Sequence, residues 1–428
     1  MSMDPERRRL LESLLERKGI RTPGSNGGPG PAPAAAGARE APASFAQARM
    51  WFLSRMDPGS PVYNVSASVR LNGRLDVGAL SAALTRIVQR HEALRTTFAE
   101  RGGEPVQVVG EPLGVEVPVV DVRPDEAMAE AGRIAAAPFD LGAGPLLRAV
   151  LLRTGEQEHV LLLAVHHIVC DGWSVGVLLS ELSELYGAAV RSRVADLPAL
   201  PVQYTDYARW QREQQSVALD ESLLFWTRTL RGTPPVLDLP ADRPRPQMQC
   251  TSGASVDVEI DPPLARRLDE LARSSGATAF MVLLAAWTTL LHRYTGRTDI
   301  VVGCPVAGRE RPELEPLVGL FVNTLPVRVD LSGEPSFADL VARVRTSVLE
   351  ALAHQSLPFE RLVEELRPPR EIATTPVFQV AFALQNAPAG DLSLEGLEVS
   401  FEQVQETTAK FDLSLDLTPL EGGIYGSL

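Results

Sequence analysis

The chain has 428 residues, of which 45% are hydrophobic and 22% charged, as in a globular protein of two or three units. Its 54 acidic and 41 basic residues give a formal net charge of −13, which disfavours nucleic acids and anionic membranes as partners. Three cysteines cannot build a disulfide framework, and the sequence has no Cys-x-x-Cys pair, no apolar run of about 18 residues and no signal-peptide core. We therefore expect a cytoplasmic protein.

The first 43 residues differ in composition from the rest of the chain. Residues 1–19 predict one short amphipathic helix, whose leucines form a single apolar stripe. Residues 20–43 are rich in proline, glycine and alanine without periodicity, which predicts a linker. The globular part is expected to start near Ser44.

From Ser44 onward, helical and strand patterns alternate. In the first half, the spacing predicts a helix over 76–92, a strand over 159–165 that is apolar on both faces, and a helix over 174–189. After a proline-rich stretch, it predicts helices at 262–274 and 278–293, a strand at 299–304, a long helix from Ser336, and strands at 377–384 and 411–417. We expect Ser336 and Asp339 to form a capping box. The pattern indicates two α/β units, residues 44–215 and 216–428.

The densest polar cluster follows the buried strand and precedes a helix. It runs from His166 and His167 to Asp171-Gly172-Trp173-Ser174. Successive side chains of a strand face opposite ways, so one histidine should face the packed interior and the other a cleft. There a histidine can act as acid, base or hydrogen-bond acceptor, and the start of the helix offers N–H donors to developing negative charge. The alternative is a pair of core histidines followed by a turn.

A second interpretation uses the same residues. Gly172-Trp173-Ser174-Val175-Gly176 fits G-x-S-x-G, the nucleophile elbow of α/β-hydrolases. Six residues separate the apolar run from this pattern, and the downstream histidines His292 and His354 lie in or beside helices, which weakens the hydrolase hypothesis. The sequence has no phosphate-binding loop and no H-E-x-x-H or paired Cys/His set for a metal.

The cluster resembles the HHxxxDG signature of the condensation domains of nonribosomal peptide synthetases. Five further stretches resemble blocks of that family in the family's order, covering about 44 to 385: SFAQARMWFL from Ser44, RHEALRTTF from Arg90, YTDYARWQ from Tyr204, VGLFVNTLPVR from Val318 and HQSLPFE from His354. The opening block also resembles that of domains that join an L-configured donor to an L-configured acceptor.

The resemblance implies a fold of two chloramphenicol-acetyltransferase-like lobes in a V, with the active site in a tunnel between them. It implies condensation of an acyl or peptidyl thioester with the amine of an aminoacyl acceptor, in antibiotic or other secondary metabolism. Both substrates arrive on phosphopantetheine arms of carrier proteins, so no cofactor is bound covalently to this domain.

The resemblance also assigns residues. His167, with His166, Asp171 and Gly172, is expected to form the catalytic motif, and His167 either abstracts a proton or orients the amine. Arg328 is expected to pair with Asp171, which makes Asp171 an anchor of the loop. Asn323, Trp173 and Ser174 are expected to support the site.

The expected partners are upstream and downstream peptidyl carrier proteins and an adjacent adenylation domain, without nucleic acid or membrane. The helix at 1–19 either docks on an upstream synthetase subunit or packs on its own lobe. Because the hairpin strand at 424–428 ends the sequence, we expect a second lobe cut short and a chain that is a segment of a longer synthetase. The alternatives are a stand-alone CoA- or carrier-dependent acyltransferase, and a non-catalytic module that recruits a partner.

Overall fold

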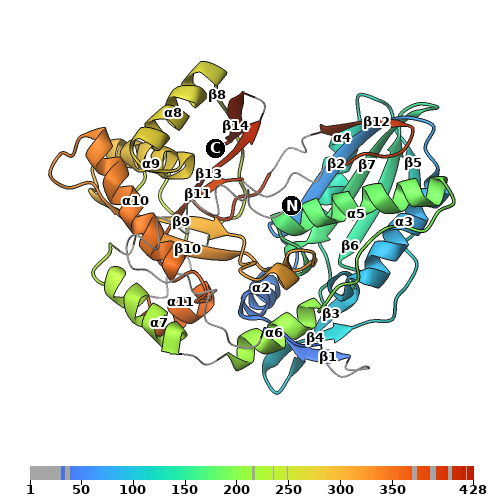
Figure 1. Ribbon diagram of the computed structural model, residues 1–428, viewed down its shortest axis with the longest axis horizontal. Helices are drawn as coiled ribbons and strands as arrows, with labels where there is room; N and C mark the ends of the chain where they lie inside the picture. Colours follow the sequence, from blue (N-terminus) through green and yellow to red (C-terminus); the bar gives the residue numbers. More distant parts are fainter. Residues whose placement is uncertain are drawn as a thin grey trace.

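The computed structural model describes residues 30–33, 39–214, 217–234, 236–247, 249–368, 374–385, 392–402, 407–420 and 422–428. The helix expected at 1–19 lies outside the described residues. Figure 1 shows two lobes side by side, with helices α2 (Phe45–Met56) and α6 (Tyr204–Glu213) below and between them. This is the two-lobed α/β arrangement that the sequence predicts.

The first lobe is built on a five-stranded sheet in the order β12-β2-β7-β6-β5. Its strands are β2 (Asn64–Gly73), β5 (Val119–Asp121), β6 (Leu147–Arg153), β7 (Glu158–His166) and β12 (Leu397–Glu402). Leu161 and Leu163 of β7 pack in the large core with α3 (Val77–Arg90) and α5 (Gly172–Val190), whereas Val160 and Leu162 pack with α4 (Ala127–Ala135). The predicted two-sided burial of this strand is confirmed.

The second lobe is built on a six-stranded sheet in the order β10-β9-β11-β13-β14-β8. Its strands are β8 (Asp257–Ile260), β9 (Asp299–Val306), β10 (Asn323–Asp330), β11 (Val380–Leu384), β13 (Leu413–Leu420) and β14 (Gly423–Ser427). Its helices are α7 (Val217–Thr229), α8 (Pro262–Ser274), α9 (Ala279–Thr295), α10 (Phe337–Ala353) and α11 (Phe359–Leu366). Strands β13 and β14 form the predicted C-terminal hairpin.

Several helices begin where the sequence places a capping side chain. The carboxylate of Asp76 accepts from the backbone N–H of Ala79 at 2.9 Å and so starts α3. Ser336 caps α10 in the same way, through the N–H of Asp339 at 3.2 Å. The reciprocal half of the expected capping box differs, because the Asp339 carboxylate accepts from the Ser336 hydroxyl at 2.6 Å.

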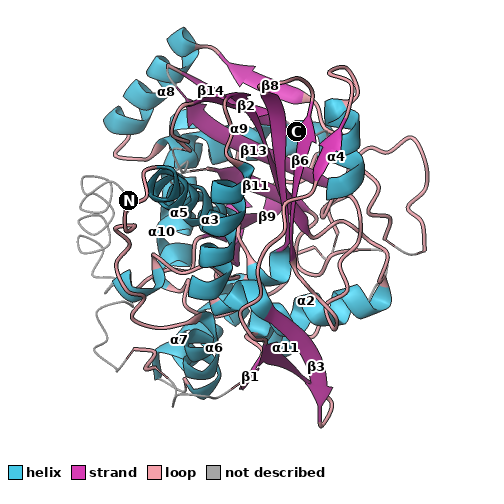
Figure 2. Cartoon of the chain, turned by 90° about the vertical axis from the view of Figure 1, so that its right-hand side faces the viewer, coloured by secondary structure: helices cyan, strands magenta, loops and turns pink. Residues whose placement is uncertain are grey.

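The predicted linker ends earlier than expected. Strand β1 (Glu40–Pro42) pairs with β4 (Glu104–Val109), and β4 pairs with β3 (Thr96–Arg101) in a small sheet at the lower end of Figure 2. Ala41 and Ala43 are 4% and 0% exposed. A segment with the composition of a linker therefore forms an edge strand here.

The boundary predicted at residue 215 fails for two segments of the second half. Strand β12 joins the first lobe's sheet, where it runs antiparallel to β2 (Figure 1). Residues 314–321 also contribute to the first lobe's core, through Leu314, Leu317, Val318, Leu320 and Phe321. The lobes are therefore interleaved along the chain rather than consecutive.

No single described helix is both long and apolar enough to cross a membrane; α8 and α9 meet that test only as a pair bent by 106°.

Candidate active site

A large cavity lies between the two lobes. Its volume is about 3510 Å³, and both lobes line it. Tyr63, His166 and His167 contribute from the first lobe, and Arg309, Asn323 and Lys410 contribute from the second half of the chain.

The two motif histidines lie where β7 ends. The backbone N–H of Ile168 donates to Nδ1 of His166 at 3.2 Å, so a neutral His166 carries its proton on Nε2. His166 is only 4% exposed and meets the edge of Phe139, with ring centroids 6.1 Å apart. The expected split between an interior and a cleft-facing histidine is incomplete, because His166 is buried and yet both histidines line the cavity.

His167 is held in one tautomer. Its Nδ1 lies 2.7 Å from the carbonyl oxygen of Cys170, which can only accept, so the proton of a neutral ring is on Nδ1. Its backbone N–H donates to the carbonyl of Tyr63 at 2.8 Å. Nε2 has no hydrogen-bond partner among the described residues, so its lone pair is available to a substrate N–H.

Both imidazoles are neutral at physiological pH. Burial lowers the pKa of His166 to about 3, with further lowering from His167 and Lys410. Burial lowers the pKa of His167 to about 4, Lys410 lowers it further, and the Cys170 carbonyl and Asp171 oppose this shift. His167 is therefore a weak base, and its neutral ring is suited to accept a hydrogen bond.

Asp171 anchors the loop that carries the histidines. One carboxylate oxygen accepts from the backbone N–H of Ser174 at 2.8 Å and from its hydroxyl at 2.7 Å, which caps α5. The other accepts from the N–H of Phe321 at 2.9 Å. Burial disfavours the ionised carboxylate, but Arg309 and these donors outweigh it, so the pKa of Asp171 is lowered.

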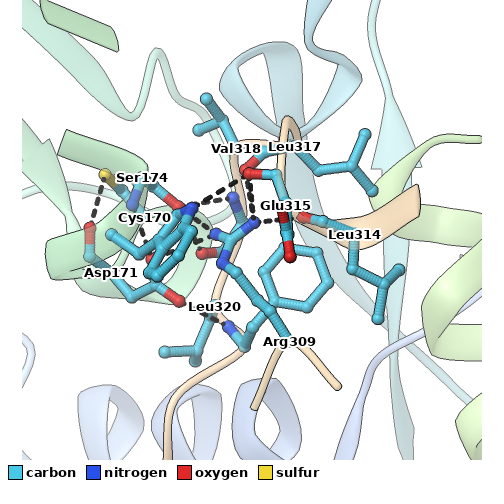
Figure 3. A network of polar contacts seen from close by, with 12 residues as sticks. Cys170, Asp171, Ser174, Arg309, Leu314, Glu315, Leu317, Val318 and Leu320 are labelled. Atoms are coloured by element: carbon cyan, nitrogen blue, oxygen red, sulfur yellow. Dashed lines mark hydrogen bonds and ion pairs between the residues drawn. The ribbon is translucent and has the colours of Figure 1, made fainter. Parts of the chain in front are cut away.

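The cation that pairs with Asp171 is Arg309, and the expected pair with Arg328 is wrong. Arg309 Nη2 lies 3.2 Å from Asp171 Oδ1 and donates to the Ser174 hydroxyl at 2.8 Å (Figure 3). Nη1 donates to the carbonyls of Leu314 and, at 2.7 Å, Leu317. Its side chain is 1% exposed, so the ion pair is buried.

Arg328 instead lies on β10 and pairs with Asp299 of the adjacent strand β9, with N–O distances of 2.8 and 2.7 Å. It also donates to the carbonyl of Thr229 at the end of α7, 2.7 Å away. The strand register fixes this outcome, because Arg328 lies opposite Val301, two residues from Asp299. Arg309 carried no signal of its own in the sequence: it follows a strand in a loop, and its partner is 138 residues away.

The other expected supports are placed as follows. Trp173 donates from its indole N–H to the carbonyl of Glu315 at 2.9 Å. Asn323 donates to the carbonyls of Gln355 and Leu357, both at 2.8 Å, and so holds the segment before α11. Gly172 has no atom within 4 Å of the place where a Cβ would stand, so a side chain there would project into open space.

Ser174 cannot be the nucleophile of a hydrolase in this arrangement. The residue is fully buried. Its hydroxyl contacts Asp171, the backbone of Gly319 and Arg309 at 2.7–3.1 Å. No histidine contacts it among the described residues, so it lacks the base of an elbow serine. It is a structural residue at the start of α5.

The described residues also contain no group of three or more His, Cys, Asp or Glu side chains that could hold a metal.

The two lobes, the cavity between them and the histidine loop at the end of β7 are the features of a chloramphenicol-acetyltransferase-like fold. The family model "Condensation domain" matches residues 38–428. The chain belongs to the condensation-domain family, whose members in nonribosomal peptide synthetases form amide bonds by acyl transfer.

Curated relatives agree with this assignment. The chain is 47% identical over 396 residues to one of the linear gramicidin synthase proteins of Brevibacillus parabrevis, a match that covers 90% of the chain but 8% of that protein. It is 44% identical over 438 residues to phosphinothricin tripeptide synthetase PhsC of Streptomyces viridochromogenes, covering 99% of the chain and 40% of the relative. The chain thus spans less than half of the length of each of these relatives.

Solved structures share the fold. The X-domain from teicoplanin biosynthesis superposes with a TM-score of 0.85 at 33% identity, over 93% of this chain and 91% of that one. SgcC5 of Streptomyces globisporus gives 0.76 at 31% identity, over 90% and 92%. The first condensation domain of the calcium-dependent antibiotic synthetase gives 0.76 at 24% identity, which supports the fold alone.

Proposed function

We propose that this domain joins a carrier-bound acyl or peptidyl thioester to the amine of a carrier-bound aminoacyl acceptor. The observation that carries the proposal is the neutral His167, whose Nε2 is available in a cavity lined by both lobes. The partners are an upstream and a downstream carrier protein, and the setting is a cytoplasmic synthetase with a neighbouring adenylation domain. Both substrates enter on phosphopantetheine arms, and the donor is L-configured.

The amine nitrogen attacks the thioester carbon, a C–N bond forms, and the C–S bond breaks as the tetrahedral intermediate collapses. The attacking amine loses a proton and the departing thiolate gains one. His167 Nε2 accepts a hydrogen bond or the proton from the amine, while its Nδ1–H stays on the Cys170 carbonyl. Holding both substrates in one cavity supplies much of the rate, because the reaction becomes effectively intramolecular.

The first turn of α5 supplies the other requirement, which is stabilisation of the oxyanion. Gly172 begins this helix beside the cavity, and a Cβ at this position would meet open space. Its backbone N–H can therefore approach the thioester oxygen without a side chain in the way. Asp171 and Arg309 fix the direction of that helix start and do not exchange protons with substrate.

The test is incubation with an acyl-loaded donor carrier and an aminoacyl-loaded acceptor carrier, read by intact mass of the acceptor. Wild-type protein should transfer the acyl group to the acceptor, and His167→Ala should lose the product while keeping its melting temperature. His292→Ala is the matched control, since His292 lies on α9 and its ring bonds the carbonyl of Arg297 at 2.8 Å, outside the residues that line the cavity. A folded His167→Ala variant of full activity would refute the catalytic role of His167.

Similarity to the teicoplanin X-domain favours a second candidate, a partner-binding module, because that domain also has a structure in complex with OxyB. The same incubation separates the two functions: a binding module yields no dipeptidyl carrier. Transfer that requires only one carrier would instead indicate the stand-alone acyltransferase.

A further inference from the structure

One lysine is presented to the reacting end of the cavity. The sequence has two lysines, Lys18 and Lys410, and only Lys410 lies in the described part of the chain. Lys410 belongs to a segment of the second half that follows β12 and precedes β13. Its side chain is exposed and lines the cavity between the lobes.

The backbone around Lys410 is fixed on the second lobe. The N–H of Ala409 donates to the carbonyl of Thr251 at 2.8 Å, and the side chain of Gln249 donates to the carbonyl of Lys410 at 3.2 Å. Two residues on, Asp412 pairs with Arg245 at 2.9 Å. The backbone position of Lys410 is therefore fixed by hydrogen bonds on both sides of the residue.

Its side chain reaches the opposite lobe. The ammonium nitrogen lies 5.9 Å from the ring centroid of Tyr63, a cation–π distance. The carbonyl of Tyr63 accepts the backbone N–H of His167. The ammonium of Lys410, from the second half of the chain, therefore lies over Tyr63, and Tyr63 binds the backbone of His167 in the first lobe.

Charges from both lobes act on His167. His166 beside it is neutral, and Asp171 in the same loop raises the pKa of His167 although its carboxylate is paired with Arg309. Lys410 acts on both histidines from the second lobe and lowers the pKa of each. The same positive potential acts on any amine brought to Nε2, and it disfavours the ammonium form.

We propose that Lys410 is a positioning residue of the amide-forming site, whose ammonium crosses the cavity above Tyr63 and keeps both His167 and the incoming acceptor amine neutral. The amine must be neutral because only its lone pair can attack the thioester. The effect on the amine rests on the proposed function, whereas the effect on His167 does not.

The test measures His167 directly and then the reaction. The ring proton of His167, assigned by comparison with His167→Ala, is titrated by NMR without substrates in the wild type, Lys410→Met and Lys410→Arg. Arg266→Met is the matched control, because Arg266 also lines the cavity, from α8, and its loss changes the net charge equally. Single-turnover condensation is then measured across pH with the same variants.

Lys410→Met should raise the titration midpoint of His167 by roughly one unit, and it should lower the rate at about pH 5 by roughly twofold more than at pH 7. Lys410→Arg should keep the wild-type titration midpoint of His167 and the wild-type ratio of the rates at pH 5 and pH 7. Arg266→Met should change neither quantity. An unchanged midpoint in Lys410→Met, or an equal shift in Arg266→Met, overturns the proposal. A rate that falls equally at pH 5 and pH 7 excludes the effect on His167 and overturns the proposal as well. Absence of amide product from the wild type counts against the proposed function, and the titration still decides the effect of Lys410 on His167.

Discussion

At the scale of single residues, the site depends on one buried ion pair. The side chains of Asp171 and Arg309 are 3% and 1% exposed, and a charge removed from water to that extent needs both a partner and hydrogen bonds. Asp171 accepts from two backbone N–H groups and a hydroxyl, and Arg309 donates to three backbone carbonyls and the same hydroxyl. Removing either side chain leaves the other as a buried charge without an ionic partner.

We therefore predict that Asp171→Asn and Arg309→Met each lower the free energy of unfolding by about 3–5 kcal/mol. The double variant should lose less than the sum of the single losses, because it leaves no buried charge. Urea unfolding measures all three. Arg328→Met is the control and should cost about 1 kcal/mol, since its pair with Asp299 is partly exposed. Additive losses would mean that Asp171 and Arg309 do not interact.

The neutral histidines predict an acid-sensitive fold. The pKa values of His166 and His167 are about 3 and about 4 in the folded chain, below the ordinary value of 6.5. Between the folded-state pKa values and 6.5, the unfolded chain binds more protons than the folded chain. The free energy of unfolding is therefore largest above about pH 6.5 and decreases as the pH falls toward 4. Urea unfolding at about pH 7 and pH 5 should show the loss, and His167→Gln should reduce it by about 1–2 kcal/mol. An identical loss in that variant would show that His167 does not contribute.

At the scale of elements, local pattern predicted most of the helices and strands. The predicted helix at 262–274 matches α8, and the helix predicted from Ser336 matches α10, because apolar spacing and capping residues are local signals. Strand β7 and the histidine loop were predicted for the same reason. Arg309 and the segment 314–321 were not, because their partners, among them Asp171, lie more than a hundred residues away. The periodic spacing of apolar residues predicts local elements and gives no information on contacts between residues so far apart in the sequence.

Gly319 shows how tightly that segment is packed. A Cβ on Gly319 would stand 2.0 Å from Cδ2 of Tyr204. The Tyr204 ring cannot move aside, because its hydroxyl bonds the carbonyl of Leu320 at 2.6 Å and the hydroxyl of Ser44 at 2.9 Å.

Gly319→Ala should therefore lower the free energy of unfolding by about 1–3 kcal/mol through overpacking. It should also slow condensation, because the segment holds Asp171 through the N–H of Phe321. Gly59→Ala is the control, since no atom lies within 4 Å of its Cβ position. Thermal unfolding and single-turnover rates decide the matter, and equal behaviour of the two variants would contradict the prediction.

At the scale of the whole molecule, β12 ties the lobes together. Six residues of β12 pair with β2, and Arg70 of β2 pairs with Glu402 of β12 at 2.6 Å. The second half of the chain thereby supplies the edge strand of the first lobe's sheet. We expect β12 to stay on the first lobe throughout the reaction.

A disulfide tests this expectation. Asn72 and Glu398 are directly paired in the β2–β12 ladder, and paired residues of antiparallel strands lie within the range that a disulfide spans. Asn72→Cys with Glu398→Cys, made with the exposed Cys250 replaced by serine, should condense at the wild-type rate with or without reductant. Inactivity of the oxidised form that reductant reverses would show that β12 must detach.

The same strand affects how the protein is made. Arg70 and its partner Glu402 are 332 residues apart in the chain. At a synthesis rate of about 5–20 residues per second, the edge of β2 emerges from the ribosome roughly 17–66 seconds before the strand that covers it. An uncovered strand edge pairs readily with other chains, so the nascent first lobe is aggregation-prone for that interval. A fragment that ends near residue 215 never passes that stage. A hybrid joined between the apparent halves would instead pair β2 of one domain with β12 of another, so the contacts of that ladder, Arg70 with Glu402 among them, must be matched across the junction.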